Sequence, residues 1–207
     1  MRDTVDRQRR AFWLKHLHRW HWISSAISLV VLLMFSVTGF TLNHAASIEA
    51  SPHVVRQAAK LPPEMLGQLA DRREKSAAVP APIAAFVAGH TGARIDGRPG
   101  DWSDDEVAVA LPRPGGDGWV SIDRETGEIE YEVTDRGWLA YVNDLHKGRN
   151  TGPVWSWFID VFALACVVFA LTGLLLLQMH GAQRRMTWPM VALGLVLPVV
   201  IALVFIH

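Results

Sequence analysis

The chain has 207 residues, half of them hydrophobic, with a formal net charge of zero and one cysteine. This length allows one modest domain besides membrane segments, and the charge balance gives no reason to expect a nucleic-acid partner. A single cysteine, Cys166, excludes a disulfide within the chain and a thiolate cluster for zinc or iron–sulfur.

Three apolar stretches predict three transmembrane helices, at residues 23–42, 154–180 and 189–206. The first contains no charged residue and is long enough to cross roughly 30 Å of hydrocarbon as a helix. It is also longer than the apolar core of a typical signal peptide. Asp160 is the one charge in the second stretch. We therefore expect an α-helical integral membrane protein in a lipid bilayer.

Charge asymmetry predicts the orientation of these helices. Residues 1–22 carry six Lys or Arg against two acids, and the short link 181–188 is also basic. Residues 44–150 carry 17 acids and 12 bases. Short basic loops stay on the cytoplasmic side. The N-terminal segment 1–22 and the link should then be cytoplasmic, with residues 43–153 periplasmic in a bacterial inner membrane.

The segment 43–153 predicts a small α+β domain. Residues 44–80 look partly helical, with a helix start at "PPEM", and "APIAAFVAGHTG" reads as a second short helix ended by glycine. The stretches "EVAVALP" and "GWVSIDRETGEIEYEV" predict antiparallel strands, with "RPGGDG" as the first hairpin turn. The stretch "GWLAYVNDLH" then leads back to the membrane.

The first two membrane segments resemble each other. "FSVTGFTL" and "FALTGLLL" place Thr38-Gly39 and Thr172-Gly173 at matching points, and Leu17-His18-Arg19 matches Leu145-His146-Lys147. The two segments cross the membrane in opposite directions, which would make an inverted repeat. Glycine at these points would allow close approach of another helix or of a bulky group.

Histidines occur near both ends of the first two helices. Neutral imidazole is a good axial ligand, and two imidazoles on opposite sides of the iron hold a haem. A cytoplasmic-side haem would use His180 with His18 or His21, and an outer haem would use His44 and His146. Helical phase aligns His18 better with His44, whereas His21 lies deeper in the membrane. The candidate ligands of haem iron are therefore His18, His21, His44, His146 and His180.

A plainer interpretation also accounts for single histidines. Histidine at a helix end commonly extends its ring to water or to lipid headgroups. We expect His16, His53, His90 and His207 to be solvated surface residues. Asp160 has two interpretations, a polar bond near the end of the first helix or a proton or cation relay.

The residues quoted above carry a family resemblance. "LHRWHWISSAISLVVLLMFSVTGFTLNH" and "DLHKGRNTGPVWSWFIDVFALACVVFALTGLLLL", with the α+β domain between them, resemble the PepSY-associated transmembrane proteins. The resemblance covers most of the chain and implies that His18 and His146 matter. Larger members look like haem-b reductases of ferric siderophores. This chain is shorter, so their siderophore site cannot be carried over.

The main functional hypothesis is therefore a haem-b electron-transfer protein with one or two haems per chain. It would take electrons from a cytoplasmic donor and reduce ferric iron or a ferric chelate outside, alone or as a subunit of a reductase, homodimer or larger membrane complex. The alternative is a non-enzymatic, membrane-anchored PepSY-like binding or regulatory module. A metal-ion transporter using Asp160 and the histidines is a third, weaker hypothesis, because three helices make too small a pathway unless the chain oligomerises.

Overall fold

The computed structural model describes residues 2–48, 51–70, 75–180 and 185–206. The chain divides into two compact units. One contains residues 1–34 and 157–207, and the other contains residues 35–156. Residues 181–184 of the predicted link 181–188 lie outside the described residues, and so does His207.

Three helices are long and apolar enough to cross a membrane, as the sequence predicts. They are α1 (Arg2–Asn43), α5 (Pro153–His180) and α6 (Thr187–Phe205). Helix α1 begins well before residue 23, so most of the basic segment 1–22 belongs to the same continuous helix as the apolar stretch. Most large apolar side chains of these helices are exposed, which suits a lipid environment.

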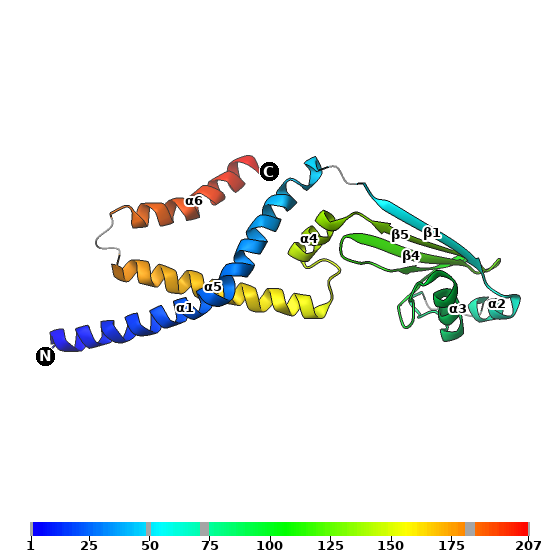
Figure 1. The fold of residues 1–207 in the computed structure, drawn as a ribbon, viewed down its shortest axis with the longest axis horizontal. Coiled ribbons are helices and arrows are strands. Elements are labelled where there is room, and N and C mark those ends of the chain that lie inside the picture. The colour runs from blue at the N-terminus through cyan, green and yellow to red at the C-terminus, as the bar shows by residue number, and fades with distance from the viewer. Residues whose placement is uncertain (1, 49–50, 71–74, 181–184, 207) are drawn as a thin grey trace. The chain divides into compact units, whose positions relative to one another are not determined.

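The second unit contains a five-stranded antiparallel sheet with the strand order β1-β5-β4-β3-β2 (Figure 1). The strands are β1 (His53–Lys60), β2 (Asp101–Trp102), β3 (Glu106–Ala110), β4 (Gly116–Asp123) and β5 (Glu128–Asp135). The strands predicted in "EVAVALP" and "GWVSIDRETGEIEYEV" correspond to β3, β4 and β5, and the predicted turn lies between β3 and β4. Strand β1 was not predicted, because residues 44–80 were expected to be partly helical.

Helices α2 (Pro63–Ala70) and α3 (Ala81–Thr91) cover one face of the sheet (Figure 1). Alternation along the strands supplies the core, since Val107, Val109, Val120, Ile122 and Ile129 all point to this face and are buried. Helix α3 ends at Gly92, which takes the left-handed conformation at φ 74°, as the sequence predicts.

A further helix, α4 (Trp138–Lys147), follows the sheet and was not predicted as a separate element. Its Asp144 Oδ2 accepts the N–H of Gly115, in the β3–β4 turn, at 2.9 Å. Its Asn143 Oδ1 accepts the hydroxyl of Thr41 on α1 at 3.1 Å. Asn143 and Asp144 are both buried. Within the second unit, α4 therefore joins the sheet to the end of α1.

Candidate functional site

The His21 site consists of His21 on α1 with Phe169, Thr172 and Gly173 on α5. The imidazole Nδ1 lies 3.0 Å from Thr172 Oγ1 and 3.2 Å from the carbonyl oxygen of Phe169. The Phe169 ring stacks on the imidazole with ring centres 4.7 Å apart. A Cβ added to Gly173 would lie 3.2 Å from His21 Cε1, so the imidazole occupies the space that glycine leaves open.

The His146 site has the same composition and lies in the other unit. It consists of His146 on α4 with Phe35, Thr38 and Gly39 on α1. Nδ1 of His146 lies 2.7 Å from Thr38 Oγ1, and the Phe35 ring centre is 5.0 Å from the imidazole centre. A Cβ on Gly39 would lie 3.4 Å from His146 Cε1. Each site thus combines one histidine with a Phe-x-x-Thr-Gly sequence from a different helix.

The hydrogen-bond partners identify the protonated ring nitrogen at the His21 site. The carbonyl oxygen of Phe169 can only accept, so Nδ1 of His21 donates to it at 3.2 Å. The hydroxyl of Thr172 donates to carbonyl oxygens of its own helix, so its oxygen accepts from the same Nδ1. At the His146 site, Oγ1 of Thr38 lies 2.7 Å from Nδ1 of His146 and 3.2 Å from the carbonyl oxygen of Phe35, and its one hydrogen can serve either.

His18 and His180 form a pair in the first unit. Their ring centres are 6.0 Å apart, and the ring planes are nearly perpendicular, at 86°. Nδ1 of His18 donates to the carbonyl oxygen of Leu14 at 2.8 Å, and Nδ1 of His180 donates to that of Leu176 at 2.9 Å. Both side chains are exposed. Nε2 is therefore the available ring nitrogen in each.

The contacts of His44 lie within its own helix. Its Nδ1 donates to the carbonyl oxygen of Phe40 at 2.9 Å, and its ring lies 4.4 Å from that of Phe40, both within α1. The interactions of His146 are instead with Phe35, Thr38 and Gly39. The structure thus brings His18 to His180 directly, and it holds His21 and His146 against threonines, which sequence reasoning did not anticipate.

The remaining predicted residues have simple surroundings. His16 packs on Phe12, His90 stacks on Phe86, and His53 is exposed at the start of β1. Asp160 is exposed on α5. Across the described residues, no group of three or more His, Cys, Asp or Glu side chains is arranged to hold a metal ion. A haem iron takes at most two axial ligands from the protein, so a haem site does not form such a group.

The ring-centre separation of the His18–His180 pair can be compared with that of two imidazoles bound to one iron. A metal–imidazole bond is about 2 Å long, so two imidazoles on opposite sides of one iron have ring centres about 6 Å apart. The observed separation is 6.0 Å. The Nδ1 bonds to carbonyl oxygens also match the way ligating histidines are usually oriented by their other ring nitrogen.

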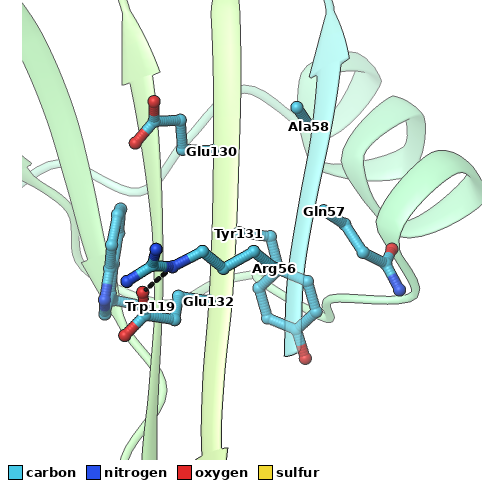
Figure 2. A pocket seen from close by; sticks show the side chains of 7 residues that line it. All are labelled: Arg56, Gln57, Ala58, Trp119, Glu130, Tyr131 and Glu132. Carbon is cyan, nitrogen blue, oxygen red and sulfur yellow. Dashed lines mark hydrogen bonds and ion pairs between the residues drawn. The ribbon is translucent and has the colours of Figure 1, made fainter. Parts of the chain in front are cut away.

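A shallow groove lies on the sheet, with a volume of about 400 Å³. Figure 2 shows Arg56 extending across β5 beside Trp119, with its guanidinium paired to Glu132. The Nε–Oε2 distance of this pair is 2.7 Å. The groove is lined by Arg56, Gln57, Ala58, Trp119, Glu130, Tyr131 and Glu132.

Three membrane helices and a small antiparallel α+β domain define a helical integral membrane protein with one domain between its first two spans. The chain belongs to the PepSY_TM-like family, whose model matches residues 12–207. The resemblance seen in the sequence is thereby confirmed for the family. No curated protein and no solved structure matches the chain.

Proposed function

We propose that this protein is a haem-b electron-transfer protein of the bacterial inner membrane. The observation that supports this best is the His18–His180 pair, with ring centres 6.0 Å apart and Nδ1 of each ring held by its own helix. In both imidazoles, Nδ1 forms the bond to the helix and Nε2 is the nitrogen left to bind a metal. Both side chains are exposed. These are the properties required of two axial ligands of one iron.

A bound haem would supply one-electron chemistry between ferric and ferrous iron. The chain's own contribution would be ligation by His18 and His180 and an apolar surround from α1 and α5. With the N-terminus cytoplasmic, this pair would lie near the cytoplasmic face and receive electrons from a donor there. His44 and His146 would serve a second haem at the other end, from which ferric iron or a ferric chelate would be reduced outside.

The test is a visible spectrum of the detergent-purified protein before and after dithionite, with a pyridine-haem count. We expect sharp reduced α and β bands, and loss of one haem per chain in His18→Ala and in His180→Ala. His90→Ala is the matched control, because His90 also bonds a carbonyl of its own helix but lies in the sheet domain. About two haems per chain would support transfer across the membrane, and one would restrict it to the His18–His180 side.

A non-enzymatic binding module is the second candidate. The observation favouring it is the groove on the sheet, where an exposed arginine and Trp119 lie together outside the core. A colourless protein from cells supplied with haem, with His18→Ala and His180→Ala as stable as wild type, would reject electron transfer and favour this candidate.

A further inference from the structure

The His21 site lies next to the His18–His180 pair on the same two helices. His21 follows His18 by three residues, and His180 follows Thr172 by eight. Three and eight residues are close to one and two helical turns. The bond between His21 and Thr172 therefore lies about one helical turn from His18 along α1 and about two turns from His180 along α5.

This contact is a close approach between α1 and α5. Thr172 is buried, and Gly173 lets α5 approach the His21 ring closely. Ser24 and Ser28, on the following turns of α1, are also buried and bond only carbonyl oxygens of α1. The His21–Thr172 bond is thus a directional link between the helices, whereas the bonds of the two serines stay within α1. Directional bonds and small residues are typical of helix contacts in membranes.

His21 is less suited than His18 to ligate the same iron. Its ring is half-buried and stacked on Phe169, and its Cε1 faces Gly173. The His146 site repeats these features with Phe35, Thr38 and Gly39. His21 and His146 therefore correspond to each other by their contacts. The matching sequences Leu-His-Arg and Leu-His-Lys instead pair His146 with His18.

We infer that His21 and Thr172 are positioning residues for the His18–His180 pair. Their hydrogen bond sets the rotation and axial register of α1 against α5, and this register brings the two exposed imidazoles to a separation that one iron can bridge. The inference rests on the proposed haem function. It assigns His18 as the ligand from the first helix and His21 as the residue that holds the helix in place.

The test uses the full-length protein in detergent and two readouts. Electron paramagnetic resonance of the ferric protein reports the mutual orientation of the axial imidazoles, and ¹⁵N resonances of histidine report which ring nitrogen carries the proton. We expect Nδ1–H at His21 in wild type. Thr172→Val should change the electron paramagnetic resonance spectrum of the haem held by His18 and His180 while most haem is retained. Thr172→Ser should restore the wild-type spectrum. Ser28→Ala is the control, because it removes a buried hydroxyl of α1 that bonds the carbonyl oxygen of Ser24 and no histidine.

The outcomes separate the inference from the proposed function. A wild-type His21 protonated at Nε2 would overturn the inference. So would an unchanged electron paramagnetic resonance spectrum, at full haem content, in both Thr172→Val and His21→Phe. Loss of haem in His21→Phe with retention in His18→Ala would also overturn it, by making His21 the ligand. A colourless wild-type protein would overturn both the proposed function and the positioning role, whereas the other results leave electron transfer standing.

Discussion

Nδ1 of His146 lies 2.7 Å from Oγ1 of Thr38, although 108 residues separate them in the chain. The intervening segment contains the whole sheet, so folding of this domain determines where its last helix, α4, meets α1. His146 is therefore held both by the domain that carries it and by the membrane helix that it contacts.

Replacing Thr38 by valine should weaken this contact. Valine keeps the shape of threonine but removes the hydroxyl that forms the hydrogen bond with Nδ1 of His146. An interhelical hydrogen bond of this kind contributes about 0.5–1.5 kcal/mol. We expect a lower thermal midpoint in detergent and faster amide exchange in α4. Thr38→Ser should restore both, and an unchanged exchange rate in Thr38→Val would contradict the assignment.

Alanine at Gly173 should disturb the His21 site more than alanine at Gly39 disturbs the His146 site. The new Cβ would lie 3.2 Å from His21 Cε1, against 3.4 Å from His146 Cε1. The shorter approach forces the imidazole to move. Gly194→Ala on α6 is the control, since a Cβ there meets nothing within 4 Å. The ¹⁵N resonances of His21 should shift more in Gly173→Ala than those of His146 shift in Gly39→Ala, and Gly194→Ala should leave both histidines unchanged. Equal shifts in Gly173→Ala and Gly39→Ala would contradict this prediction.

Asp144→Ala should loosen the attachment of the sheet to α4. The buried carboxylate accepts the N–H of Gly115, where φ is 72° and a Cβ would lie 2.8 Å from the backbone of Tyr141. Leaving a buried N–H without its acceptor costs about 1–3 kcal/mol. Hydrogen exchange should show loss of protection at Gly115 first. Protection equal to wild type would mean that the tight packing against Tyr141 holds the turn unaided.

The β4–β5 turn should become less stable in acid through Asp123. Bonds from the backbone N–H and the side chain of Thr126, and a further bond from the N–H of Glu125, lower the pKa of Asp123 below its ordinary value of 3.8. The ionised form is favoured by folding, so its contribution is complete above the ordinary pKa and is lost as pH falls through the lowered pKa.

Thermal unfolding followed by circular dichroism checks this pH dependence. Asp123→Ala should lower the midpoint of the sheet domain at pH 7, and its difference from wild type should narrow below about pH 4. Asp104→Asn, another acid of the same domain, controls for net charge. A difference that stays constant from pH 7 to pH 2 would show that ionisation of Asp123 contributes nothing.

Sequence patterns predicted the elements whose periodicity was clear. The three apolar helices and strands β3, β4 and β5 were identified, because length and alternation are local signals. Strand β1 was missed because "HVVRQAAK" contains alanine, glutamine and lysine, which favour helices by propensity. Pairing with β5 along the whole of β1 overrides that preference.

The histidine contacts were only partly predictable. The two Thr-Gly pairs indicated close approach, and Gly39 and Gly173 do each face a ring. Which ring they face depends on the register between helices far apart in sequence, and no local pattern contains that register. The match of Leu-His-Arg to Leu-His-Lys therefore selected His18 as the counterpart of His146, whereas the contacts select His21.

The position of β1 has a consequence for the order in which this domain is made. Strands β3, β4 and β5 pair with their sequence neighbours and can form as soon as residues 106–135 have emerged. Strand β1 emerges first but pairs only with β5, His53 opposite Asp135. Strand β1 therefore stays unpaired until β5 has been synthesised. Pairing between strands so far apart in the sequence slows folding. The exposed Arg56 and Lys60 on that strand would discourage its association with other nascent chains meanwhile.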